Sequence, residues 1–272
     1  MKTMKNAFSL VLAIALAGEL HAQTESKPQQ QLVVPLSQPG KPCKVKVGAL
    51  YGSIKVVGYE GKDVVVDVET EKHSESSSSG GGMRRIGGGG AEVTAQEDDN
   101  SVTVSAGLSH IIRMTVKVPQ VVSELTLSTV NDGDISVSNV SGQLEINNVN
   151  GWIHCEGISG SVVANTINGD LIIGFKAIDP KAAMAFSTLN GKVDVTFPAD
   201  LKANVKLKAE RGDVFSDFDV DVDKGHPNIE KKPEDHMYRI NIDEWVYGKI
   251  GGGGPELMMK TTDGSVYVRK AK

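Results

Sequence analysis

Four aspartates alternate along one short segment: Asp217, Asp219, Asp221 and Asp223. Alternation with a period of two places all four carboxylates on one face of a strand, where they could contact a partner or bind calcium. A calcium loop needs a glycine at its sixth position for a sharp turn, and Lys224 stands there instead. We therefore predict a charged, solvated strand face that discourages edge pairing, and no metal site.

Two further carboxylates, Asp170 and Asp194, occupy predicted outward positions, with Lys192 near them in the sequence. A pair of carboxylates could cleave a sugar polymer by acid–base chemistry. The outward face of this segment, however, lacks the Arg, His and aromatic residues that a substrate groove needs. A carbohydrate-active β-helix enzyme, resembling a polysaccharide lyase or hydrolase, is therefore the alternative function and not the first one.

The other reactive side chains form no recognisable catalytic or metal-binding set. His154 and Cys155 are sequence neighbours, so in a strand they point to opposite faces and cannot share a metal. Ser159 lies in Gly-Ile-Ser-Gly, which lacks the final glycine of a hydrolase nucleophile elbow. We predict no catalytic residue, no cofactor and no bound metal.

Trp152 follows Gly151 at a predicted outward position. Exposed tryptophans are frequent contact residues, so Trp152 joins the four aspartates as a candidate contact. The Ser- and Gly-rich segment 74–90 could instead fold over it, because such a composition favours a flexible loop. The sequence leaves these two alternatives open.

These side chains depend on a repeat in which glycine recurs at every ninth position: Gly133, Gly142, Gly151, Gly160 and Gly169. The second and fourth residues after each glycine are apolar or small, with outward residues between, which predicts a short strand with one buried face. The glycine allows the left-handed backbone of a tight corner. The pattern therefore predicts successive short strands joined by tight corners.

The residue before each glycine alternates between Asn or Asp and Ser, so the full repeat is two strands with about 18 residues in total. Coiling with this period would stack Asn150, Asn168 and Asn190 about 4.8 Å apart as a ladder at one corner, although the step to Asn190 is slightly longer. Asn-Gly also forms hairpin turns, so an antiparallel meander is the competing fold. A meander does not require matching corner residues at this spacing. We favour an all-β, single-chain β-solenoid (β-helix) with about 18–22 residues per coil.

The chain begins with the pattern of a secretory signal peptide. Lys2 and Lys5 precede an apolar run that is too short to span a bilayer, and a small residue precedes a plausible cleavage point after Ala22. No later run is long enough to span a membrane. The predicted organisation is a signal peptide at 1–22, an extended tether at 23–42 and a β-solenoid domain at 43–272, with flexible loops at 74–90 and 223–237 and less regular capping strands at both ends.

Composition narrows the partners. The net charge of −5 argues against nucleic acid and anionic membranes. Export permits a disulfide, but Cys155 falls at an inward repeat position, which favours a buried free thiol. Whether Cys43 and Cys155 pair stays open.

Three stretches resemble a known family: 212–219, the segment 248–270 with its run of four glycines, and the Asn-Gly units. They are similar to the bacterial β-strand-repeat proteins called the putative-adhesin family, a domain of unknown function. The resemblance covers most of residues 43–272, although Asp263-Gly and Arg211-Gly replace Asn-Gly near the C-terminus. It implies an exported, envelope-associated β-helical protein without established catalytic residues.

The expected function follows from these points. We expect an exported, non-enzymatic protein in the periplasm or on the surface of a bacterium, or outside the cell. It would present rigid strand faces to an unidentified envelope protein or glycan. Self-association through open solenoid ends is a further expectation.

Overall fold

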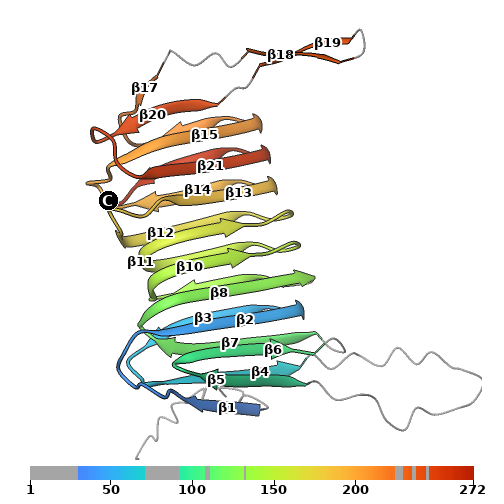
Figure 1. Cartoon of the computed structure of the whole chain (residues 1–272), viewed down its shortest axis with the longest axis vertical. Coiled ribbons are helices and arrows are strands. Elements are labelled where there is room, and N and C mark those ends of the chain that lie inside the picture. The colour runs from blue at the N-terminus through green and yellow to red at the C-terminus, as the bar shows by residue number, and fades with distance from the viewer. Residues whose placement is uncertain are drawn as a thin grey trace, which may run out of the picture.

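The computed structural model describes residues 30–70, 92–107, 111–131, 133–223, 229–234, 237–242 and 245–272. Within these ranges every regular element is a β-strand, which confirms the all-β prediction. The strands form a tall stack, seen from the side in Figure 1.

The stack has two layers, and β11 (Ile153–Asn165) runs through both because it bends near Gly157. In order along the stack, the first layer contains β5 (Val93–Asp98), β6 (Ser101–Ala106), β2 (Cys43–Tyr51), β8 (Val121–Asn131), β10 (Ser141–Asn147), the second half of β11, β13 (Met184–Asn190), β21 (Glu256–Asp263), β15 (Ala203–Arg211), β20 (Val246–Ile250) and β17 (Asp221–Val222). The second layer contains β1 (Gln30–Pro35), β4 (Asp63–Thr70), β7 (Ile112–Pro119), β3 (Ile54–Tyr59), β9 (Ile135–Ser138), the first half of β11, β12 (Leu171–Ile178), β14 (Val193–Phe197), β22 (Val266–Lys270) and β16 (Val214–Ser216).

Neighbouring strands in the middle of the stack pair in parallel and in register. Leu144 of β10 lies opposite Val162 of β11, and Leu171 of β12 lies opposite Val193 of β14. The sequence separations in these two pairs equal those between the stacked corner asparagines, Asn150 to Asn168 and Asn168 to Asn190. A hairpin meander would have placed antiparallel strands side by side. The repeat length read from the glycines is therefore the chain length between stacked strands.

Two pairs of strands lie in the stack out of chain order. β2 and β3 lie between β6–β7 and β8–β9. β21 and β22, the last strands of the chain, lie between β13–β14 and β15–β16. The last strands of this chain therefore lie inside the stack and do not cap it. Antiparallel pairs that include β1, β5, β17 and β20 stand nearer the two ends, where they interrupt the regular parallel edge.

Two predicted boundaries are also wrong. The extended tether at 23–42 contains β1, which pairs with β4, because Val34 and Leu36 bury their side chains against the core. The predicted loop at 223–237 contains β18 (Ile229–Glu234), which pairs with β19 (Met237–Ile242) as a two-stranded sheet. The signal peptide at 1–22, residues 23–29 and the whole of 74–90 lie outside the described residues.

The core lies between the layers and is built from alternate strand residues. Phe175, Phe186 and Phe197 meet there, with the first and last rings stacked at a centroid distance of 5.4 Å. Cys43 and Cys155 are buried free thiols. Burial raises the pKa of the Cys155 thiol to about 12, because a thiolate would lose its hydration, so this side chain is un-ionised at neutral pH.

One corner of the stack is a column of glycines that lie one above another. In stack order these glycines are Gly52, Gly133, Gly151, Gly169, Gly191, Gly264 and Gly212. If a Cβ were added to any glycine in this order except Gly52, it would lie within 2.3 Å of the carbonyl oxygen of the glycine before it. Gly191 and Gly264 also have positive φ values, 144° and 148°. No other residue fits such a column without moving the coils apart.

A second column lines the inside of the same corner, a few residues before each glycine. Thr188 donates a hydrogen bond from Oγ1 to the carbonyl oxygen of Gly169 (2.9 Å), and Thr261 does the same to Gly191 (2.7 Å). Equivalent bonds are made by Thr129, Asn148 and Thr166. All five side chains are buried. Each therefore ties one coil to the glycine of the coil beside it.

We predict that Gly191→Ala destabilises the protein by more than the roughly 1–3 kcal/mol of an unfavourable backbone conformation. The added methyl would also stand 2.3 Å from the Gly169 oxygen. Gly174→Ala is the matched control, since its nearest neighbour would be 3.8 Å away. Chemical unfolding followed by circular dichroism measures both. Equal stability of the two variants would contradict the crowded corner.

Thr188→Val should cost about 1–3 kcal/mol, because it keeps the shape of the side chain but leaves the part-buried Gly169 carbonyl without this donor. Thr188→Ser should restore most of the loss, since it returns a hydroxyl. Thr196→Val, on an outward position of β14, is the control. A Thr188→Val protein as stable as the parent would show that the inner column contributes nothing.

Candidate functional site

The three ladder asparagines lie directly outside the glycine corner. The side-chain amide of Asn168 donates to Asn150 Oδ1 (2.7 Å), and that of Asn190 donates to Asn168 Oδ1 (2.6 Å). Their side-chain hydrogen-bonding groups thus bond to one another along the stack. This arrangement gives Asn150, Asn168 and Asn190 a structural role at the corner.

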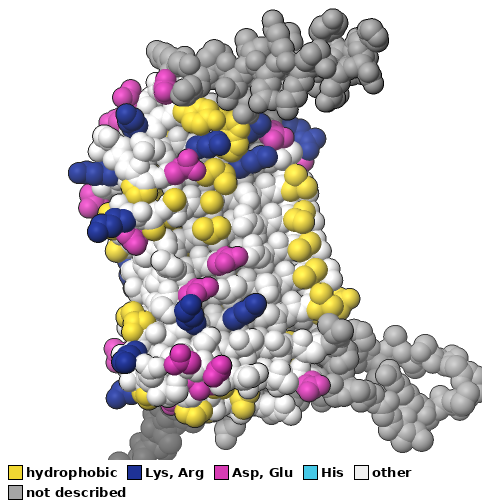
Figure 2. Space-filling model, in the orientation of Figure 1, with side chains coloured by type: hydrophobic (Ala, Val, Ile, Leu, Met, Phe, Trp, Pro, Cys, Tyr) yellow, Lys and Arg dark blue, Asp and Glu magenta, His cyan; other side chains and the backbone are white. Residues whose placement is uncertain are grey.

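A second polar ladder, which the sequence analysis missed, runs beside the first. Asn165 donates to Asn147 (3.2 Å), and Ser187 donates to Asn165 (2.6 Å). Between the two ladders lies a narrow line of apolar side chains that includes Ile167 and Leu189, both more than 40% exposed. Figure 2 shows hydrophobic side chains following one edge of the stack. The flanking ladders keep this line one side chain wide.

The acidic segment does not form the single strand expected from its alternation. β16 ends at Ser216, and residues 218–220 leave the sheet after the Asp217 amide has bonded to Val268 of β22, so Asp217 and Asp219 lie apart from β17. Ser216 causes the bend, because its hydroxyl bonds both the amide and the carbonyl of Phe218. The prediction that all four carboxylates share one strand face is therefore wrong.

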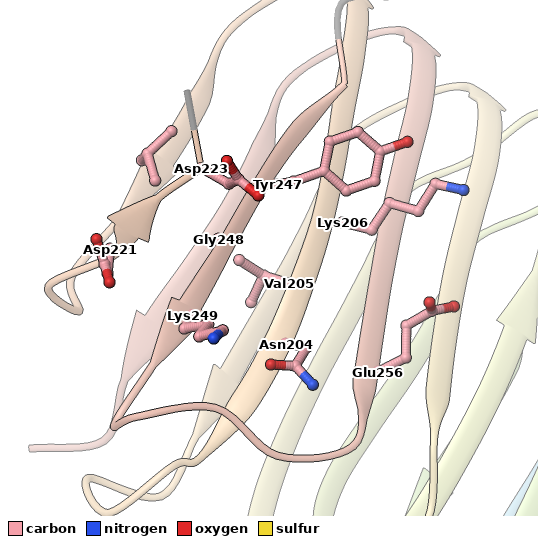
Figure 3. Close-up of a pocket in the computed structure, with 10 residues that line it drawn as sticks. Asn204, Val205, Lys206, Asp221, Asp223, Tyr247, Gly248, Lys249 and Glu256 are labelled. Carbon is pink, nitrogen blue, oxygen red and sulfur yellow. The ribbon is translucent and has the colours of Figure 1, made fainter. Parts of the chain in front are cut away.

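Asp221 and Asp223 instead border an open depression of about 680 Å³ near one end of the stack. Figure 3 shows that its lining comes from several strands, with Lys206 and Glu256 on neighbouring strands of the first layer. The ammonium group of Lys206 lies over the Trp245 ring, 4.6 Å from its centroid. Charges of both signs line the depression, so it has no marked preference for an anion or a cation.

The outward surface of the second layer has a different composition. Trp152 is 42% exposed, and its ring meets the His154 ring edge to face at a centroid distance of 6.0 Å. These two side chains, with Asp170 and Ile172 on the next coil, border an open depression of about 490 Å³. Trp152 is held in place through its backbone amide, which donates to Asp134 Oδ1 (3.0 Å).

The inserted strand β22 adds Tyr267 and Arg269 to this surface. Arg269 donates two hydrogen bonds to the buried carboxylate of Asp194, at 2.6 and 3.0 Å, and its guanidinium lies 5.0 Å from the Tyr267 ring centroid. The hydrogen bond to Asp194 raises the pKa of Arg269. Tyr267 stacks on Phe215 of β16 with centroids 5.1 Å apart. Phe215 is 48% exposed.

We call this surface the aromatic lane. It consists of outward side chains of the second layer: Trp152, His154, Asp194, Tyr267, Arg269 and Phe215. The expectation that the outward face near Asp170 and Asp194 lacks Arg, His and aromatic residues is therefore wrong. β22 is far from β14 in the chain, and only its insertion beside β14 brings Tyr267 and Arg269 next to Asp194. The alternation of Val266, Val268 and their polar neighbours was the available signal, but it carried no information on the neighbouring strand.

Both carboxylates at the lane accept hydrogen bonds from groups of the same chain. Asp194 is buried and bound by Arg269 in two-point contact, with Lys192 Nζ 3.8 Å away. Asp170 accepts a hydrogen bond from the Lys192 amide (2.9 Å). Across the described ranges, no group of three or more His, Cys, Asp and Glu side chains could hold a metal ion. A search of these ranges also found no helix able to span a membrane.

Comparison with known proteins gives a family. The structure of a putative cell adhesion protein from Clostridium sporogenes aligns at a TM-score of 0.48 and 11% identity, over 89% of this chain and 99% of that one. A putative adhesin from Bacteroides fragilis aligns at a TM-score of 0.38 and 11% identity, over 90% and 99%. No curated protein matches the sequence. The family model described as Toastrack DUF4097 matches residues 91–244, over half of the chain, and the protein therefore belongs to this family.

Proposed function

We propose that this chain is an exported, non-enzymatic protein of the bacterial envelope or cell surface, built as one β-solenoid and adhesin-like in action. Its rigid strand faces would be the binding surface for a protein or glycan partner. Its place would be the periplasm, the cell surface or the surroundings of the cell, reached through the signal peptide expected at 1–22.

The observation that carries this proposal is the in-register stacking of the coils. Each strand in the middle of the stack pairs on both sides, and the corner glycines leave no room for the coils to shift. Outward side chains therefore stand in fixed rows about 4.8 Å apart. A binding surface of this kind needs little ordering when a partner docks, which lowers the entropic cost of association.

The geometry at Asp194 supports a non-enzymatic role over the alternative of a carbohydrate-active enzyme. A general acid or base must reach the substrate and exchange a proton with it. Asp194 is buried, and both of its oxygens accept hydrogen bonds from Arg269. These bonds occupy the positions on the two carboxylate oxygens at which a proton would be exchanged with a substrate.

A combined binding and turnover assay tests the proposed function. The mature chain is incubated with envelope fractions and cell-wall polysaccharides of the bacterium that encodes it, and both retention and new reducing ends are measured. We expect retention with no product, and an unchanged result for product formation in Asp194→Ala. Turnover that Asp194→Ala abolishes would establish the enzyme alternative.

Fractionation of cells that produce the full chain tests export separately. We expect the protein in the periplasmic, surface or medium fraction, with cleavage after Ala22 leaving Gln23 as its first residue. Mass spectrometry of the purified protein identifies this N-terminus. Full-length protein confined to the cytoplasm would contradict the proposal.

A further inference from the structure

The aromatic lane has a regular geometry across the stack. His154, Ile172, Asp194, Tyr267 and Phe215 lie opposite one another in register, on β11, β12, β14, β22 and β16. With about 4.8 Å between strands, the Tyr267 strand is roughly 14 Å from the coil of Trp152, and the Phe215 strand is roughly 19 Å from it. Aromatic rings therefore stand near both ends of a flat, elongated surface.

Apart from Ile172, the side chains between the rings are polar and are held by contacts within the chain. Arg269 and Asp194 bind each other, and the indole ring is oriented by His154 and by the backbone bond to Asp134. Among the residues that the structure describes, the lane thus presents ring faces separated by hydrogen-bonding groups, and these rings do not merge into one broad apolar patch. A protein partner that buries a hydrophobic core fits such a surface poorly.

The charges at the lane determine whether an elongated polar ligand should be neutral or charged. Asp170 borders the depression beside Trp152, and Asp213 and Asp217 stand directly before and after β16, while the charge of Asp194 is balanced by Arg269. Lys192 lies 3.8 Å from Asp194 and adds to that balance. The surface therefore carries an excess of negative charge, which repels polyanions such as nucleic acids and sulfated or uronic-acid polymers.

We propose that the aromatic lane binds a neutral polysaccharide that runs along the long axis of the stack, across the strands. The apolar faces of sugar rings would pack on Trp152 at one end and on the Tyr267–Phe215 pair at the other. The hydroxyl groups would bond to His154, Asp170 and the outer groups of Arg269. This inference rests on the proposed function as a binding protein and names the class of its ligand.

Native gel electrophoresis in gels that contain a polysaccharide tests the lane directly. The probes are neutral dextran, mannan, xylan and mixed-linkage β-glucan, with dextran sulfate as the charged counterpart of dextran. We expect retardation by at least one neutral polymer and none by dextran sulfate. Retardation by dextran sulfate, or by none of the five polymers, would overturn the proposal.

Variants then locate the binding surface. Trp152→Ala and Phe215→Ala should each weaken retention by at least about fivefold, because exposed aromatic contacts of this kind contribute more than most interface side chains. Leu189→Ala is the matched control, since Leu189 is 46% exposed but belongs to β13 of the first layer, whereas the lane lies on the second. Unchanged retention in both lane variants, or equal loss in the control, would place the ligand elsewhere.

A fluorescence measurement separates binding at the lane from a loss of folding. The chain contains two tryptophans, Trp152 and Trp245, so Trp245→Phe leaves Trp152 as the only indole. The polysaccharide that retards the protein should shift or quench this emission in a saturable manner, and circular dichroism should be unchanged. An emission that does not respond to a retarding polymer would contradict contact at Trp152.

These outcomes differ from those that test the proposed function. If the chain retains envelope material without cleaving it but binds no neutral polysaccharide, the proposed function stands and the proposed ligand class is wrong. If the chain binds a neutral polysaccharide at the lane and also releases product in a reaction that needs Asp194, the ligand class stands and the non-enzymatic role is wrong.

Discussion

The close approach of the backbone at the glycine corner is the constraint on which the structure depends. Each coil passes very near the next. A Cβ at this corner would lie only 1.8 to 2.3 Å from a carbonyl oxygen of the neighbouring coil, far closer than two such atoms can approach. The buried Thr and Asn side chains of the inner column bond to carbonyls of the same glycines and hold the contact together. Coil spacing, register and the inward direction of the apolar residues all follow from this fixed corner.

Out-of-order insertion makes the candidate site possible. Asp194 and Arg269 are 75 residues apart in the chain, yet they form the two-point contact at the middle of the aromatic lane. Tyr267 gains Phe215 as a stacking partner for the same reason, because β22 lies between β14 and β16. The lane is therefore a property of the assembled stack, and no continuous segment of the sequence contains it. Its polar members are already paired with one another, which leaves the ring faces as the distinctive accessible feature.

The sequence was informative where neighbours in space are also one repeat apart. The glycines and the ladder asparagines predicted the coil length and the corner, because the offset of one coil is visible in the order of residues. The positions of β2–β3 and β21–β22 could not be predicted, since a strand pattern specifies a buried face and not the strand that will lie beside it. The alternation of aspartates suggested one strand, but the local hydrogen bonds of Ser216 redirected the chain after β16.

The inner column of the corner was visible in the sequence but not interpretable from it. Thr166 and Thr188 each stand three positions before a corner glycine, and Asn148 stands at the equivalent position one coil earlier. Alternation alone gave these polar residues no special role. Their function depends on a carbonyl of the neighbouring coil, which only the stacked structure brings within reach.

The placement of the last strands inside the stack has a consequence for biogenesis. A ribosome makes residues 256–270 only after the strands that flank them in the stack, β13, β14, β15 and β16. Until these residues are made, β13 and β14 each lack one of the two parallel neighbours that they have in the finished molecule, and β15 and β16 lack the strands that join them to the rest. The stack therefore cannot be completed by adding coils one after another in chain order. Maturation of the C-terminal part must wait for a long-range closure event, of the kind that slows folding in proteins rich in distant contacts.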